Sequence, residues 1–283
     1  MALNKQLLAQ IIEDKLKPLV KKVDEQAHYA ESYILALGEA GFFQSANKDQ
    51  SSLLVDEATV VRETAKVCMT TAFCVWCHLA ALTYLRNSDN AFLKNDVLPQ
   101  LENGVKLGAT GLSNAMKYYS GLEKLHLTAE KTEAGYIING TLPAVSNLGK
   151  RHYFGAIATI DTRDVMVLVS TNASGLEMTE RLGFIGVNGS ATYTCKFENV
   201  VIPNDFVISE DAKAFCDIIR PTFIYYQVPL GAGVIAAAAD GIEKVKAKQN
   251  GCNDFLKVQA TELRSHHERI EAELNQLASN LTL

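Results

Sequence analysis

The chain has 283 residues, of which 48% are hydrophobic and 21% charged, and its formal net charge is −5. A chain of this size buries roughly three quarters of its unfolded surface, and we expect two subdomains or one large composite domain. The negative charge excludes a broad electrostatic attraction to nucleic acid or to anionic membranes. The longest apolar run, Val228–Ala239 with its glycines set aside, is too short to span a bilayer.

Apolar residues recur at helical spacing from the start of the chain to about residue 104. The first predicted helix is amphipathic and contains acidic residues, which indicates neither a signal peptide nor a transit peptide. We therefore expect a cytoplasmic protein. Gly41 fits the end of a second helix. The further helices predicted in this part are Val55–Thr64, Val67–Leu85 and Leu93–Leu101.

One of these helices contains Cys74 and Cys77 at C-x-x-C spacing, followed by His78. This spacing can hold zinc, perform thiol exchange or, with the histidine, mark haem attachment. Zinc would need two further ligands at suitable spacing, which the sequence lacks, and such haem attachment belongs to exported proteins. We therefore expect reduced cysteines buried on a core helix and no metal site. The cysteines lie at positions 68, 74, 77, 195, 216 and 252.

From about residue 106 to residue 209 the pattern indicates β-strands. Asn139-Gly140 follows a short apolar run and favours a hairpin turn. Ser146–Gly149 then interrupts the apolar pattern before Tyr153–Ile160 resumes it. Hydroxyl and amide groups beside glycine at a strand end suit close approach to a ligand, although an ordinary three-strand meander has the same pattern. Further strands are predicted at Val165–Ser170 and Phe197–Pro203.

The chain is helical again from about residue 211. We predict one long helix, Ile218–Lys248, and a last amphipathic helix, Phe255–Leu281. Gly231–Ala236 matches G-x-G-x-x-A, but no strand precedes it, so it is not a dinucleotide-binding motif. The order of elements predicts an α+β fold. Its parts are an N-terminal helical domain (1–104), a middle antiparallel domain that resembles a β-barrel (105–212), and a short C-terminal helical domain (213–283).

Several segments, in this order, resemble the acyl-CoA dehydrogenase family of flavoproteins. They are Leu35–Phe42, Gly135–Gly140, Leu182–Ser190 followed by Phe197–Pro203, and Arg220 with Gly231. The resemblance implies FAD bound between the strand domain and the C-terminal bundle of a homo-oligomer, a dimer or tetramer. It also implies an acyl-CoA-like substrate, whose Cα–Cβ bond is oxidised when a glutamate removes the α-proton and the flavin takes the β-hydride.

The resemblance assigns candidate FAD-binding residues position by position. Ser146 falls on the hydroxyl residue that contacts the flavin ring, with the polar Asn147 beside it. Ser113 falls on a second hydroxyl contact and Ser120 on a pyrophosphate contact. Lys248 stands where the family has an arginine that reaches the FAD of a neighbouring subunit, and Gln259 matches the glutamine that follows. These six residues are the predicted cofactor site.

The sequence also departs from the family pattern. Ala144 stands in place of the aromatic residue near the flavin, and Leu142 in place of a lysine. Ile219 occupies one of the two positions of the catalytic glutamate, and the other position lies outside this sequence. Asp217 and Glu180 are possible substitutes, but the sequence does not place either near a substrate, so the catalytic base is unassigned.

Two alternatives to the dehydrogenase interpretation follow. A flavin monooxygenase on the same fold needs no glutamate base, and His78 is its candidate proton donor beside the flavin. The structural interpretation of His78 is a hydrogen-bonded histidine in the protein core. The other alternative is a catalytically inactive member that binds a ligand or serves as partner subunit to a complete relative. An oligomer with the last helix at its interface would bury the exposed face of the C-terminal bundle.

Overall fold

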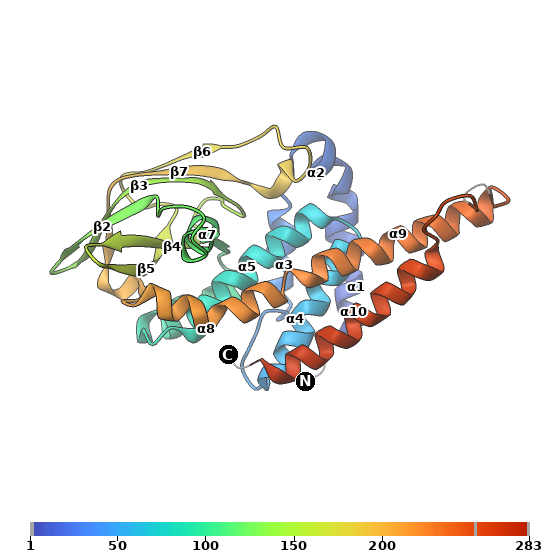
Figure 1. Cartoon of the computed structure of the whole chain (residues 1–283), viewed down its shortest axis with the longest axis horizontal. Helices are drawn as coiled ribbons and strands as arrows, with labels where there is room; N and C mark the ends of the chain where they lie inside the picture. Colours follow the sequence, from blue (N-terminus) through green and yellow to red (C-terminus); the bar gives the residue numbers. More distant parts are fainter. Residues whose placement is uncertain (1–2, 252–253, 282–283) are drawn as a thin grey trace.

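The computed structural model describes residues 3–251 and 254–281. A curled sheet lies at one end of the molecule, and helices from both ends of the chain pack together beside it, as Figure 1 shows. The helices are α1 (Lys5–Ile11), α2 (Val20–Gln26), α3 (Glu31–Glu39), α4 (Gln50–Ala65), α5 (Met69–Asn87), α6 (Leu98–Glu102), α7 (Ser113–Tyr119), α8 (Ala212–Tyr225), α9 (Val228–Lys248) and α10 (Ala260–Asn280). The strands are β1 (Gly108–Thr110), β2 (Leu127–Thr132), β3 (Gly135–Val145), β4 (Tyr153–Ile160), β5 (Arg163–Ser170), β6 (Leu176–Glu180), β7 (Tyr193–Pro203) and β8 (Val207–Ser209).

Two π-helical turns interrupt the N-terminal helices, and each lies just before a proline. Ile12–Leu16 precedes Pro18, and Leu93–Val97 precedes Pro99. Proline has no amide N–H to donate, and its ring collides with the carbonyl four residues earlier in a regular α-helix. The wider π turn moves that carbonyl away, so the chain passes each proline without ending the helical path.

Helix α5 lies at the centre of the molecule. Its residues from Cys74 to Leu85 are all buried. It packs against α4 and α8 and against the first strand of the sheet, β1. This position explains why the sequence of α5 is apolar all round rather than amphipathic. Residues on different faces of α5 therefore belong to different environments.

The sheet has the strand order β6-β7-β3-β2-β4-β5-β8, and β1 pairs with β4. Most pairs are antiparallel, but β1 and β2 run parallel to β4. The sheet is therefore mixed and open, which corrects the expectation of an antiparallel, barrel-like domain. The parallel pairs arise because the segment after β3 returns the chain across the sheet before β4 begins. The predicted strands at Tyr153–Ile160, Val165–Ser170 and Phe197–Pro203 lie within β4, β5 and β7.

The predicted hairpin turn at Asn139-Gly140 is wrong. The β2–β3 turn lies at residues 133–134, between the paired Thr132 and Gly135, and β3 continues through Asn139 and Gly140. Gly140 instead lies at a bulge in the pairing of β3 with β7. Its φ of +126° and the carbonyl oxygen of His126, 2.2 Å from where a Cβ would stand, explain the glycine. A second departure from the predicted strand zone is α7, a helix between β1 and β2.

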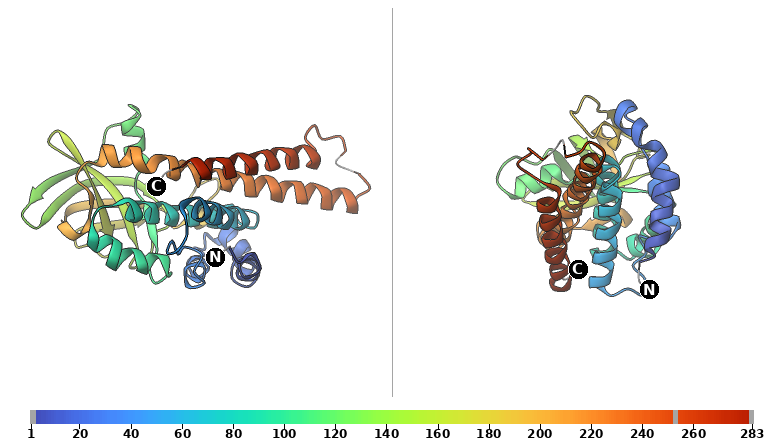
Figure 2. Two further views of the ribbon diagram at one scale, coloured as in Figure 1. Left: turned by 90° about the horizontal axis from the view of Figure 1, so that it is seen from below. Right: turned by 90° about the vertical axis from the view of Figure 1, so that its right-hand side faces the viewer.

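The C-terminal part contains three helices where two were predicted. The predicted helix Ile218–Lys248 is divided into α8 and α9 just before Pro229, which lacks the N–H to continue the hydrogen bonding. The last helix, α10, begins at Ala260 rather than at Phe255. It runs back along α9 and also packs against α4, and Figure 2 shows the α9–α10 hairpin extending beyond the rest of the molecule.

The consecutive helices α8 and α9 are, by length and composition, apolar enough to cross a membrane. Half of their most apolar window is buried inside the protein. Core helices of water-soluble proteins pass the same test, so this segment is only weak evidence for a membrane span.

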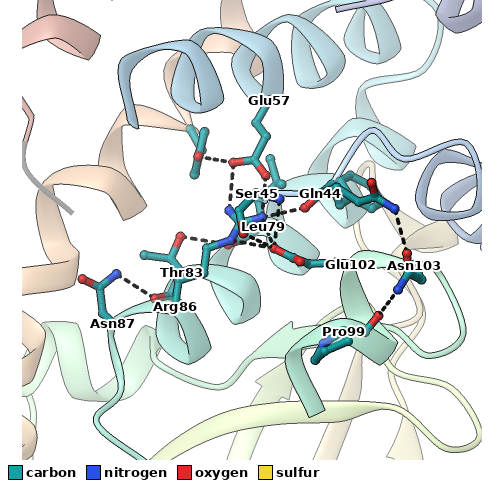
Figure 3. A network of polar contacts seen from close by, with 12 residues as sticks. Gln44, Ser45, Glu57, Leu79, Thr83, Arg86, Asn87, Pro99, Glu102 and Asn103 are labelled. Atoms are coloured by element: carbon teal, nitrogen blue, oxygen red, sulfur yellow. Dashed lines mark hydrogen bonds and ion pairs between the residues drawn. The ribbon is translucent and has the colours of Figure 1, made fainter. Parts of the chain in front are cut away.

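A buried ionic network joins the helices. The Arg86 guanidinium on α5 donates to Glu57 on α4 at 3.0 Å, to Glu102 on α6 at 3.1 Å, and to the carbonyl oxygen of Phe43 at 2.7 Å. The Tyr226 hydroxyl, between α8 and α9, donates to the same Glu57 carboxylate. Glu57 is fully buried, and Figure 3 shows the carboxylates converging on the guanidinium. Five segments that are distant in sequence therefore meet at one cation.

Replacing Arg86 by methionine leaves two buried carboxylates without their cation. We expect the free energy of unfolding to fall by about 3–5 kcal/mol, because an uncompensated buried charge is costly. Urea unfolding followed by circular dichroism measures the change. Arg264→Met, which removes an exposed cation paired with Asp240 and Glu243, is the control and should have a much smaller effect. Equal losses in the two variants would contradict the role assigned to Arg86.

Candidate functional site

A cavity of about 450 Å³ lies where α5, α7, the end of β3 and the end of α8 meet. One wall is aromatic. Trp76 stacks on Phe73, with ring centroids 5.4 Å apart, and meets the edge of Phe223 at 4.9 Å. The opposite wall carries hydroxyl groups. The remaining lining residues are Cys77, Met116, Lys117, Ala144 and Gln227.

The aromatic wall also fixes the end of α8. The Trp76 indole N–H donates to the carbonyl oxygen of Phe223 at 3.1 Å. Phe223 lies in the last turn of α8, where carbonyl groups have no partner within the helix. This bond satisfies one of them and holds α8 against α5. The wall is thus rigid on both sides, which suits a site that binds a flat ring.

Three hydroxyl residues from different elements form the opposite wall. Thr110 ends β1, Ser113 begins α7, and Ser146 follows β3. Thr110 and Ser146 form an isolated antiparallel bridge, which brings the ends of β1 and β3 together. The Thr110 hydroxyl is hydrogen-bonded to Tyr84 at 2.6 Å, and the Ser146 hydroxyl to Thr192 at 2.7 Å. The Thr110 hydroxyl also accepts from the backbone N–H of Leu112 at 3.3 Å. Both hydroxyls are therefore held by protein, and that of Ser146 can also bind a ligand.

Ser113 and Ser146, two of the residues that the resemblance assigns to the flavin, both line this cavity. Ala144, which replaces a family aromatic, lines the same cavity. The aromatic wall was missed by the sequence analysis, because aromatic residues at helical spacing are typical of a core helix. The sole signal in the sequence was the presence of Trp76 between the two cysteines of the C-x-x-C motif.

The structure places Ser120 and Asn147 outside the cavity lining. Ser120 is exposed after α7, and its hydroxyl donates to the carbonyl oxygen of Met116. Asn147 is fully buried with a φ of +64°. Its side-chain amide donates to the carbonyl oxygen of Gly108 at 2.8 Å and accepts from the Tyr29 hydroxyl at 2.7 Å. Asn147 therefore anchors the turn that presents Ser146.

Lys248 and Gln259 lie at the tip of the α9–α10 hairpin, far from the cavity (Figure 1). Lys248 is the last residue of α9, and Gln259 immediately precedes α10. The resemblance assigned Lys248 to the FAD of a neighbouring subunit and matched Gln259 to the glutamine that follows, and both assignments stay predictions. The structure brings neither residue to the hydroxyl wall.

His78 does not line the cavity. Its Nδ1 accepts a hydrogen bond from the backbone N–H of Gly108 at 2.9 Å, and its ring packs on Phe43 at 4.6 Å. Burial, aided by electrostatic interaction with His152 and Arg86, lowers the pKa of His78 to about 3. The ring is neutral at ordinary pH, which leaves the proton on Nε2. The structure thus agrees with the core-histidine interpretation and gives no support to a proton donor beside a flavin.

The cysteines of the C-x-x-C motif are buried free thiols, as expected for a core helix. Burial raises the pKa of both Cys74 and Cys77. Cys77 reaches the cavity wall as a neutral thiol. Cys252 lies outside the described residues. Within residues 3–251 and 254–281, no group of three or more histidine, cysteine, aspartate or glutamate side chains is arranged to hold a metal ion.

No carboxylate belongs to the cavity lining that the described residues form. Asp217 is exposed on α8 and forms an ion pair with Lys213. Glu180 is exposed at the end of β6. Ile219, which stands at one family position of the catalytic glutamate, is buried. Neither substitute base considered from the sequence lines this cavity.

The pKa of His78 predicts a pH dependence of stability. The unfolded chain binds a proton on this ring below a pH of about 6.5, whereas the folded chain does not until about pH 3. Protonation therefore favours unfolding, and the contribution of His78 to stability falls by up to about 1.4 kcal/mol per pH unit below about pH 6.5. His78→Asn keeps an acceptor for Gly108 but does not titrate. We expect the stability difference between wild type and variant, from urea unfolding, to shift in favour of the variant as the pH falls. A difference independent of pH would contradict this assignment.

The chain is similar to known proteins over most of its length. Residues 3–104 match the family model "Acyl-CoA dehydrogenase, N-terminal domain". The short-chain-specific acyl-CoA dehydrogenase of Clostridium acetobutylicum is 24% identical over 235 residues, which cover 75% of this chain and 59% of that protein. The chain thus spans about three fifths of the length of the curated relatives it matches.

Solved structures show the same fold. The butyryl-CoA dehydrogenase of Megasphaera elsdenii superposes with a TM-score of 0.82 at 18% identity, covering 98% of this chain and 77% of that one. The FAD complex of PigA superposes with a TM-score of 0.77 at 19% identity, covering 98% and 79%. The matched N-terminal domain, the curated relatives and this shared architecture together support a member of the acyl-CoA dehydrogenase family.

Proposed function

We propose that this chain is an FAD-dependent oxidoreductase that acts on the acyl group of a thioester. The observation that carries the proposal is the convergence of Ser113 and Ser146 on one cavity, opposite an aromatic wall. The motifs that assign these two serines to the flavin are more than thirty residues apart in sequence. The acyl-CoA dehydrogenase relatives and the FAD complex of PigA support the cofactor and the substrate class.

The residues present fit an isoalloxazine ring. The Phe73–Trp76–Phe223 wall offers flat apolar surface and excludes water, and the hydroxyl wall offers donors and acceptors for ring heteroatoms. When bound, FAD supplies the acceptor for the hydride that leaves the substrate. Ser146 and Ser113 would hold and orient the ring, and the aromatic wall would limit the space beside it. No described residue is assigned the removal of the substrate proton, because the cavity lining has no carboxylate.

That absence of a carboxylate favours a second candidate function. A member that keeps the cavity but has no base within the described lining would bind flavin or an acyl thioester without oxidising it, as a binding or partner subunit. Both candidate functions use the same cavity, and they differ in whether a bound acyl thioester is oxidised. No comparable observation favours the monooxygenase alternative, since His78 lies away from the cavity.

We further propose that the protein functions in the cytoplasm and that its domains divide near residues 104 and 212. We also propose that it forms a homo-oligomer. Exposed apolar side chains follow α8 and α9: Ile218, Ile224, Val228 and Val234 are each between 39% and 54% exposed. A series of this kind is unfavourable in water and is characteristic of a contact surface. The last helix, α10, also exposes Leu277 at 48%.

Purified protein should retain FAD after incubation and desalting, with a visible flavin absorption band. Met116→Trp, which enlarges a side chain of the cavity lining, should abolish retention. Tyr118→Trp, on the same helix but outside the lining, is the matched control and should retain FAD. Anaerobic addition of acyl-CoA should bleach the band if the chain is a dehydrogenase. A persistent band would support a flavin-binding member that does not oxidise the acyl thioester. A colourless wild type would contradict the oxidoreductase and leave the partner subunit.

The oligomer is tested by substituting its proposed surface. Ile224→Asp combined with Val234→Asp should reduce the mass measured by light scattering after gel filtration, because two charges would have to be buried in the interface. Ile185→Asp changes a fully exposed apolar residue on the β6–β7 connection and is the control. A wild type that is monomeric at micromolar concentration would contradict the proposal.

A further inference from the structure

A chain of three hydroxyl groups leads from the protein interior to the cavity. The Ser190 hydroxyl lies 2.7 Å from that of Thr192, which lies 2.7 Å from that of Ser146. Ser190 and Thr192 are buried, with at most 4% of each exposed, whereas Ser146 is partly exposed and lines the cavity. Each of the three hydroxyl groups has one proton to donate. The two hydrogen bonds between the groups use two of these protons, and the third remains for another acceptor.

The surroundings of Ser190 decide the direction of these bonds. Among residues 3–251 and 254–281, the Ser190 hydroxyl has no hydrogen-bond partner other than Thr192. Suppose that the hydroxyl groups donated inward, Ser146 to Thr192 and Thr192 to Ser190. The buried proton of Ser190 would then have no acceptor, and an unmade buried hydrogen bond is costly. In the opposite direction Ser190 donates to Thr192 and Thr192 donates to Ser146. Every buried proton is then used, and the proton of Ser146 is free to point into the cavity.

The backbone holds this arrangement from both sides. The amide N–H of Asn147 donates to the carbonyl oxygen of Ser190 at 2.9 Å, and the amide N–H of Arg181 donates to that of Thr192 at 2.7 Å. Val187 and Ala191 both adopt the left-handed backbone region, with φ of +60° and +46°. Left-handed backbone is unfavourable for a β-branched residue such as Val187, and such strain persists where the surrounding structure imposes it. The segment around Ser190 is therefore fixed in place and not adaptable.

We propose that Thr192, supported by Ser190, is a positioning residue that presents the Ser146 hydroxyl as a hydrogen-bond donor to the flavin. The inference rests on the proposed function, since it assumes that FAD occupies the cavity. Thr192 does not line the cavity and acts through Ser146. A serine whose proton is committed to the cavity binds an acceptor atom of the ring without first having to reorient.

The test is a double-mutant cycle on the full chain, with the FAD dissociation constant and the absorption maximum of the bound flavin as readouts. Thr192→Val removes the hydroxyl at nearly constant volume, and we expect FAD to bind about three- to tenfold more weakly, the range of one lost hydrogen bond. Thr192→Ser keeps a hydroxyl and should bind within about twofold of wild type. In a Ser146→Ala background, Thr192→Val should have no further effect, because Thr192 acts through Ser146.

The possible outcomes separate this inference from the proposed function. A wild type that fails to bind FAD overturns both. A wild type that binds FAD, with Thr192→Val unchanged or equally harmful with and without Ser146, overturns the role of Thr192 alone. Thermal unfolding of each apo variant shows whether it folds. If Thr192→Val does not fold, Ser190→Ala replaces it, and we expect weaker FAD binding that again disappears in the Ser146→Ala background; unchanged binding would overturn the inference.

Discussion

The buried guanidinium of Arg86 is the contact on which the helical part of this protein depends. It lies between the carboxylates of Glu57 and Glu102 and the carbonyl oxygen of Phe43, and Tyr226 completes the set through Glu57 (Figure 3). Charges removed from water are tolerated when each is paired and hydrogen-bonded, and these requirements are met here by groups from distant segments. If one of these segments moved away, a buried charged group would lose its partner within an apolar interior. The network therefore fixes α4, α5 and α6 relative to the junction of α8 and α9.

The cavity follows from that arrangement. Helix α5 presents Arg86 to the network and, nearer its start, Trp76 to the cavity. Tyr226, which binds Glu57, lies three residues after Phe223, whose carbonyl accepts from Trp76. Helix α5 is thus linked to the end of α8 twice, directly through Trp76 and Phe223 and indirectly through Arg86, Glu57 and Tyr226. The hydroxyl wall comes from the ends of two strands and from the start of α7, so the site exists only where the helical part and the sheet meet.

The differences between predicted and observed structure have common physical causes. Asn139-Gly140 has strong local turn propensity, but cross-strand pairing with β2 and β7 overrides it and uses the glycine for a bulge. Proline had mixed consequences. Pro229 ends one helix and begins another, whereas Pro18 and Pro99 are accommodated by π turns. A proline removes one backbone hydrogen bond from a helix. The packing around it decides whether the helix ends there or widens into a π turn.

The sequence by itself determined the α+β order of helices, strands and helices and the burial of the cysteines on α5, and its resemblance to a known family singled out Ser113 and Ser146 as candidates. These features depend on periodicity and on motifs that are continuous in the chain, so they are readable without coordinates. Tertiary structure alone decided that Trp76 and Phe223 form a wall, that His78 faces Gly108 and not the cavity, and that Asn147 is an anchor. Adjacent residues of a helix such as Cys77 and His78 point about 100° apart, and which of those directions faces a cavity depends on neighbours distant in sequence. The Ser146–Thr192–Ser190 chain was likewise invisible, because its members lie on separate segments that only the folded sheet brings within hydrogen-bonding distance.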